Sequence, residues 1–214
     1  MKTDINDSIN FLKTGFKDYL SARVLLNNNL IYTGSILAST SVEKYLKAVM
    51  SISGNIRPVH LDNLSKIKDI FKHSKFDILD KLDIHFLELL GKIYKFRYYD
   101  NIRKGMDGFG FPILQFIGSL DYTIHQIESS ITINGKDGPR KSDYEIEKDR
   151  KNQLLIEHNY ILNNLDKKEF MEQPSSLYTL IIGNKKEIAE EVIEHTKVSS
   201  TYNGHINVLS DFRM

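Results

Sequence analysis

The chain has 214 residues, and its 29 Lys and Arg side chains are nearly balanced by 28 Asp and Glu, which leaves a net charge of +1. This balance argues against a strongly basic nucleic-acid-binding coat, although it permits a local basic patch. The absence of cysteine excludes disulfides and thiolate metal sites, and it is compatible with a reducing cytoplasm. No stretch reaches the roughly 20 apolar residues of a membrane span, and residues 1–16 lack the apolar run of a signal peptide. We therefore expect a cytoplasmic protein without a membrane segment.

Residues 1–133 predict a mainly α-helical domain. Apolar residues recur every three or four positions, which is typical of helices that bury one face. The expected helices cover residues 7–26, 34–54, 57–74, 76–97 and 113–131. Gly54 is expected to cap the end of the second helix. Five such helices with short connections favour an antiparallel bundle.

The composition changes after residue 133. Residues 134–143 contain two glycines, a proline and five charged residues, and this pattern predicts a linker or an exposed loop. Residues 144–214 have a mixed pattern, which predicts either a small C-terminal α+β appendage or a partly ordered extension. Within it the pattern indicates a polar helix over 145–165, a strand over 176–183, a helix over 185–195 and a second short strand over 205–214.

Common cofactor and metal signatures are missing from the sequence. Gly105, Gly108 and Gly110 follow a predicted helix rather than a strand, and no Gly-Lys-Ser/Thr loop for phosphate occurs. We interpret these glycines as a mobile turn in which positive backbone dihedrals are permitted. The seven histidines show no paired helical spacing, so the sequence predicts neither a metal site nor a cofactor.

Basic and aromatic residues gather where the fourth predicted helix ends. The candidate ligand-binding residues of this stretch are Arg97, Tyr98, Tyr99, Asp100, Arg103 and Lys104. A guanidinium can hold a phosphate with two parallel donors, and tyrosine rings can stack on bases. A structural interpretation fits the same residues, since cations favour the negative end of a helix dipole and Arg97 can pair with Asp100.

Two further candidate ligand-binding residues come from earlier in the chain. Lys47 follows Glu43 by four residues in the second predicted helix, a spacing that stabilises an exposed helix by a few tenths of a kcal/mol. That ion pair is a sufficient reason for the spacing, so a binding role for Lys47 requires that it lie near Arg97 across the bundle. His60 follows the next predicted turn.

Three short motifs, taken in order and with their helical setting, resemble the HEPN domain (higher eukaryotes and prokaryotes nucleotide-binding). They are Glu43, Lys44, Lys47 and Ala48, then His60 and Leu64, then Arg97, Tyr98, Tyr99 and Asp100. The resemblance covers roughly residues 8–133. It implies a helical bundle that forms a homodimer and works beside a nucleotidyltransferase partner in toxin–antitoxin or defence modules, with RNA or nucleotide as its ligand.

Many HEPN proteins are metal-independent ribonucleases whose signature is an arginine, four to six residues, and then a histidine at the dimer interface. That chemistry requires a proton-transfer group and a cation near the scissile phosphate. Here no histidine follows Arg97 or Arg103 at that distance, and Tyr99 replaces the proline of the family motif. The resemblance therefore implies a non-catalytic module that binds nucleotide, nucleic acid or a nucleotidyltransferase partner.

Two alternatives to the non-catalytic module stay open. One is a ribonuclease with an unorthodox site, built from Arg97, Asp100 and Arg103 and completed by His60. The other is a scaffold protein that acts within a larger assembly.

Overall fold

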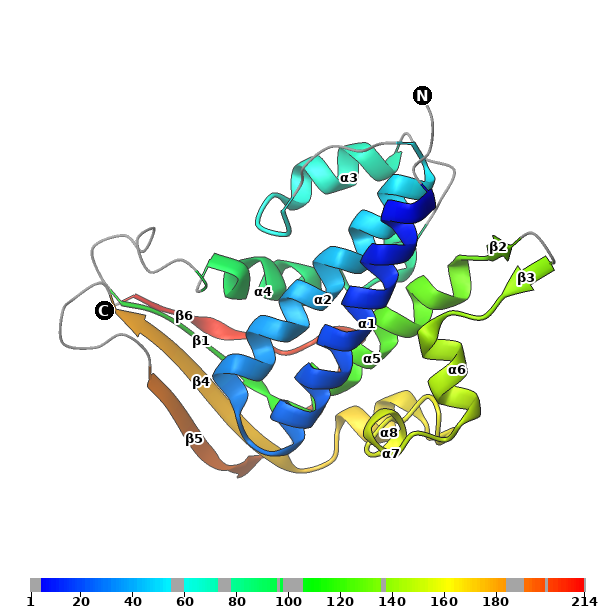
Figure 1. Ribbon diagram of the computed structural model, residues 1–214. Helices are drawn as coiled ribbons and strands as arrows, with labels where there is room; N and C mark the ends of the chain where they lie inside the picture. The colour runs from blue at the N-terminus through cyan, green and yellow to red at the C-terminus, as the bar shows by residue number, and fades with distance from the viewer. Residues whose placement is uncertain are drawn as a thin grey trace.

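The computed structural model describes residues 5–54, 60–72, 78–95, 97, 106–135, 138–183, 191–198 and 200–213. These residues form a mainly helical protein with a small antiparallel sheet along one side (Figure 1). Within this part of the chain, no helix is both long enough and apolar enough to cross a membrane.

Two long helices lie side by side along the length of the molecule (Figure 1). Helix α1 covers Ile5–Asn27 and α2 covers Ile31–Ile52. Their connection is tight, and Asn29 within it has a φ of 61°, a left-handed conformation that asparagine tolerates better than most residues. Gly54, with a φ of 79°, follows α2 and confirms the predicted glycine cap.

The other helices of the predicted bundle are also present, in shorter form. They are α3 (Leu64–Lys72), the 3-10 turn η1 (Leu79–Lys81), α4 (Ile84–Lys95) and α5 (Ile113–Ser130). The fourth predicted helix is divided because Asp83 starts a new one. Its Oδ1 accepts hydrogen bonds from the backbone N–H groups of His85 at 2.9 Å and Phe86 at 3.2 Å, which caps α4.

The glycines after α4 do not form the turn that we expected, and this prediction is wrong for Gly108 and Gly110. Both lie inside a strand, β1 (Met106–Pro112), and neither has a positive φ. A Cβ atom at Gly110 would lie 3.1 Å from the Thr179 hydroxyl, so glycine here permits close strand packing. Gly105 lies outside the described residues.

Strand β1 belongs to a four-stranded antiparallel sheet with the order β5-β4-β1-β6. The other strands are β4 (Ser175–Gly183), β5 (Glu191–Val198) and β6 (Leu209–Arg213). The predicted strand over 176–183 is confirmed, and the strand predicted over 205–214 is confirmed for residues 209–213. The predicted helix over 185–195 is wrong for residues 191–195, which belong to β5. Because β1 lies between α4 and α5 in the chain, this sheet joins the C-terminal region to the helical part.

The segment after α5 is more regular than a linker. Strands β2 (Ile133–Gly135) and β3 (Gly138–Arg140) pair in antiparallel fashion. Three short helices follow, α6 (Asp143–Asp149), α7 (Gln153–Ile156) and α8 (Lys167–Met171). The predicted helix over 145–165 is broken because Lys151 and His158 adopt left-handed φ values of 54° and 52°.

A buried ion pair connects three separate segments of the chain. Arg23 of α1 pairs with Asp121 of α5, and both side chains are fully buried. The Arg23 guanidinium also donates to the backbone carbonyls of Leu154, at 3.2 Å, and Glu157. Burial opposes the charge of Arg23, but the adjacent Asp121 carboxylate and Tyr19 side chain together outweigh this effect and raise the pKa of Arg23. The helices after residue 142 are thereby attached to the core of the bundle.

Replacing Asp121 tests this connection. We expect Asp121→Ala to lower the free energy of unfolding by about 3–5 kcal/mol, because Arg23 would stay buried without a counter-charge. The matched control is Asp18→Ala, which removes a partly exposed carboxylate that pairs with Lys44 at 2.7 Å. That loss is expected to cost about 1 kcal/mol or less. Urea denaturation measures both, and equal losses would contradict a dominant role for the buried pair.

Candidate functional site

A buried carboxylate, Glu43 of α2, is the central acceptor of the candidate site. Its Oε1 atom lies 2.7 Å from Lys47 Nζ, one helical turn away, and 3.3 Å from His60 Nδ1. Its Oε2 atom accepts a hydrogen bond of 3.1 Å from the backbone N–H of Leu61. Glu43 is only 7% exposed, so these donors replace the water that its charge would otherwise need. The carboxylate thus fixes the position of His60 against α2.

Tyr94, near the end of α4, connects His60 with Arg97. The Tyr94 hydroxyl lies 2.8 Å from His60 Nδ1, and the two rings stack with their centroids 5.4 Å apart. The guanidinium carbon of Arg97 lies 5.1 Å from the centre of the Tyr94 ring, within the range of a cation–π contact. Tyr94 is buried, whereas Arg97 is exposed. We call Glu43, Lys47, His60, Tyr94 and Arg97 the α4-end site.

The structure therefore brings together three candidate residues, Lys47, His60 and Arg97. They come from α2, from the segment before α3 and from the end of α4. Lys47 joins the group through Glu43, which is how it comes to share a site with Arg97. The remaining candidates lie outside the described residues, so their role stays a prediction: Tyr98, Tyr99, Asp100, Arg103 and Lys104.

The contacts of His60 define what this side chain can do chemically. Both Glu43 and Tyr94 contact the same ring nitrogen, Nδ1, so Nε2 is the nitrogen that can meet a ligand. When Nδ1 donates its proton to Glu43, Nε2 is an acceptor. When Nδ1 accepts from the Tyr94 hydroxyl, Nε2 carries the proton. The His60 side chain is 50% exposed, which makes either form accessible from solvent.

Two members of the α4-end site were not among the residues that we predicted to bind a ligand. Tyr94 precedes Arg97 by three residues, a spacing that places both on one helix face, and this signal was available in the sequence. Glu43 was recognised as the ion-pair partner of Lys47 and as part of the HEPN-like motif, but not as a ligand-binding residue. Its contact with His60 depends on how the segment before α3 returns to α2, which no local pattern encodes.

No group of three or more His, Asp or Glu side chains in the described part of the chain is arranged to hold a metal ion. No protein-family model, curated protein or solved structure matches this chain. A function must therefore be inferred from the residues and from their geometry.

Substituting Glu43 tests whether it organises the α4-end site. We expect Glu43→Ala to lower the free energy of unfolding by about 1–3 kcal/mol, since the N–H of the fully buried Leu61 loses its acceptor. The ring resonances of His60 should shift in the same variant. Glu43→Gln is the matched control, because its side-chain oxygen can still accept from Leu61. Urea denaturation and histidine NMR spectra provide the readouts, and unchanged spectra for Glu43→Ala would exclude the assigned role.

Proposed function

We propose that this chain is a HEPN-like, non-catalytic module that binds RNA or nucleotide through the α4-end site. The observation that carries the proposal is the exposed Arg97 guanidinium above the Tyr94 ring, next to the half-exposed His60 imidazole. The Arg97 guanidinium supplies paired donors for a phosphate, and the half-exposed His60 ring can stack on a base. The site thus offers both kinds of contact that single-stranded nucleic acid uses.

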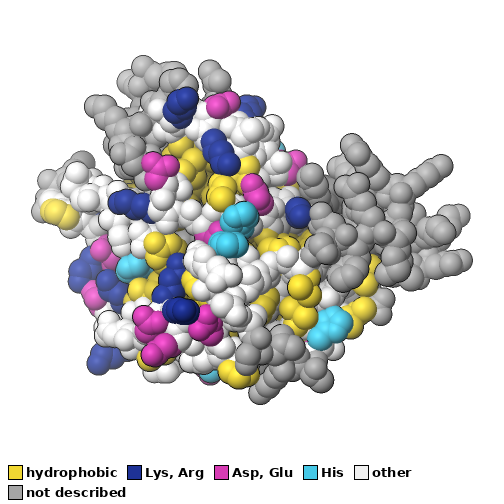
Figure 2. All heavy atoms as spheres, turned by 180° about the vertical axis from the view of Figure 1, so that it is seen from behind, with side chains coloured by type: hydrophobic (Ala, Val, Ile, Leu, Met, Phe, Trp, Pro, Cys, Tyr) yellow, Lys and Arg dark blue, Asp and Glu magenta, His cyan; other side chains and the backbone are white. Residues whose placement is uncertain are grey.

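The charges around the α4-end site support an anionic ligand. Glu43 would repel a phosphate, but it is buried and lies against the ammonium group of Lys47. Arg97 is exposed to solvent, whereas the Lys47 side chain is only 20% exposed. On the face seen in Figure 2, basic and acidic side chains are interspersed. Binding would therefore depend on a local contact rather than on the charge of the whole protein.

The resemblance supplies the other parts of the proposal. A homodimer, a nucleotidyltransferase partner and a place in a toxin–antitoxin or defence module are proposed on that basis alone. A cytoplasmic location is proposed from the composition of the chain. The five candidate residues outside the described part of the chain extend the same basic and aromatic stretch beyond Arg97.

Removal of the Arg97 charge tests nucleic-acid binding. We expect Arg97→Ala to weaken binding of a short single-stranded RNA by about tenfold at low salt, as the loss of one charge-assisted contact implies. The slope of log K against log salt concentration should fall by about 0.7, the value for one phosphate contact. The control is Arg150→Ala, which removes an exposed arginine at the end of α6. Fluorescence anisotropy at several salt concentrations measures both. An Arg97→Ala isotherm like that of the wild type would favour the scaffold alternative.

A second candidate function, metal-independent cleavage of RNA, is favoured by the position of His60. This chain lacks the histidine that the ribonuclease signature requires after Arg97. His60, however, contacts the same Tyr94 ring that Arg97 covers. In the form with Nε2 unprotonated, His60 can remove the proton of a ribose 2′-hydroxyl. The 2′-oxygen then attacks the adjacent phosphorus, the 5′-oxygen leaves and takes up a proton, and a 2′,3′-cyclic phosphate is formed.

Incubation of excess protein with single-stranded RNA and a chelator tests this second function. A ribonuclease would produce 2′,3′-cyclic phosphate ends, and His60→Asn should lower the rate by about a hundredfold or more, as for the loss of a general base. His158→Asn is the matched control, because His158 is exposed and has a left-handed backbone that asparagine accepts. RNA that stays intact at high protein excess would exclude cleavage and leave the binding module.

A further inference from the structure

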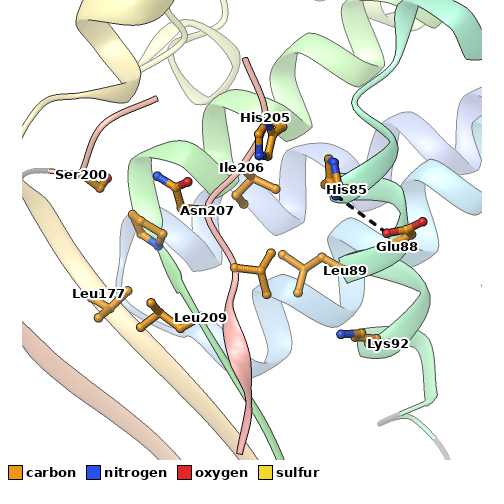
Figure 3. A pocket seen from close by; sticks show the side chains of 12 residues that line it. His85, Glu88, Leu89, Lys92, Leu177, Ser200, His205, Ile206, Asn207 and Leu209 are labelled. Carbon is orange, nitrogen blue, oxygen red and sulfur yellow. Dashed lines mark ion pairs between the residues drawn. The ribbon is translucent and has the colours of Figure 1, made fainter. Parts of the chain in front are cut away.

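A cavity of about 650 Å³ lies between α4, the end of β1, β4 and the C-terminal segment 200–209 (Figure 3). This volume is within the range of roughly 300–1,000 Å³ that small-molecule sites occupy. The residues that line it are all described, and none of them belongs to the α4-end site. We call it the α4–tail cavity.

Half of the residues that line the α4–tail cavity are aliphatic. The apolar lining residues are Leu89, Pro112, Leu177, Ile206, Val208 and Leu209. They come from α4, from two strands and from the C-terminal segment, and Figure 3 shows Leu89, Leu177 and Leu209 around the same space. Apart from two imidazoles, no aromatic ring is among the lining residues. Such walls suit an aliphatic chain better than a nucleobase.

Polar groups gather at the α4 side of the cavity. The rings of His85 and His205 lie 4.6 Å apart, although 120 residues separate them in the chain. Lys92 lines the same wall two turns further along α4 (Figure 3). Glu88 contributes the only lining carboxylate among the described residues, and its Oε2 lies 3.9 Å from His85 Nδ1. The cavity is thus lined by two imidazoles, one ammonium group and one carboxylate. The donor groups outnumber the carboxylate, which favours a ligand with a single negative charge.

The C-terminal segment that forms one wall is held in place by hydrogen bonds to Gln115 and Asp83, two residues that do not line the cavity. Gln115, which is fully buried, accepts from the Asn207 N–H at 2.9 Å and donates to the Ser200 hydroxyl at 2.8 Å. Asp83 accepts from the Ile206 N–H at 2.9 Å through the oxygen that does not cap α4. Since Ser200 uses its oxygen as an acceptor, its O–H remains a donor for a ligand. The cavity is therefore formed before any ligand enters.

We propose that the α4–tail cavity binds a small aliphatic carboxylate. The carboxylate group would lie against His85 and His205, where imidazole N–H groups supply donors, and its chain would lie along Leu89, Leu177 and Val208. A carboxylate matches the cavity better than a phosphate monoester, because the second charge of a phosphate would meet Glu88. The site is separate from the α4-end site and does not depend on the function proposed for it.

Calorimetric titration with octanoate tests the proposal. We expect octanoate to bind at a single site. It should bind at least tenfold more tightly than octan-1-ol, which has the same chain without the charge. It should also bind at least tenfold more tightly than acetate, which has the charge without the chain. Equal binding of octanoate and octan-1-ol would overturn the proposal.

Two variants locate the binding within the cavity. His85→Gln combined with His205→Gln removes both imidazoles, and we expect it to weaken octanoate binding at least tenfold. Leu209→Glu places a negative charge at a wall residue that is 42% exposed, so the fold should tolerate it, and octanoate should bind at least tenfold less tightly. His158→Asn, outside the cavity, serves as the control and should bind like the wild type. Octanoate binding that is unchanged in either cavity variant would contradict the proposed site.

Discussion

The arrangement of the whole chain depends on how one buried charge is neutralised. Arg23 cannot lose its proton at physiological pH, and it lies fully inside the protein. Asp121 supplies the counter-charge from α5, and Tyr19 donates a hydrogen bond of 2.7 Å to the same carboxylate. The remaining guanidinium donors take their acceptors from residues 154 and 157. The C-terminal region must therefore lie against α1, and contacts cross the boundary that the composition suggested at residues 134–143.

Helix α4 has a comparable role for the two candidate sites. Its start is fixed by Asp83, which caps the helix and also binds the backbone of Ile206. Its middle forms one wall of the α4–tail cavity, and its end carries Tyr94. A single rigid element thus sets the position of side chains in both places. The two sites nevertheless present different chemistry, with aliphatic walls in one and an exposed cation above a ring in the other.

The sequence patterns predicted the elements whose signal lies within one stretch of chain. They did not predict contacts between residues that are far apart in the sequence. Helix α2 was predicted because its apolar stripe and Gly54 both belong to one stretch of chain. Strand β1 was missed because Phe109 and Phe111 alternate with glycines over too few residues to indicate a strand. The α4-end site was anticipated in part, since Arg97 belongs to a basic and aromatic cluster. Its contact with Tyr94 follows helical spacing, whereas the contact of His60 with Glu43 depends on tertiary structure. The ring pair of His85 and His205 had no local signal at all.

The central position of β1 also constrains when the sheet can form. Gly108 pairs with Phe212, so this strand cannot complete its hydrogen bonds until about a hundred further residues have been synthesised. At roughly 5–20 residues per second, a ribosome needs several seconds for that length. During this interval α1 and α2 can already associate, while the Phe109 and Phe111 segment lacks its partners on both edges. The nascent chain consequently exposes the unpaired Phe109 and Phe111 segment, a target for chaperones and a source of misassembly, until β6 has been synthesised.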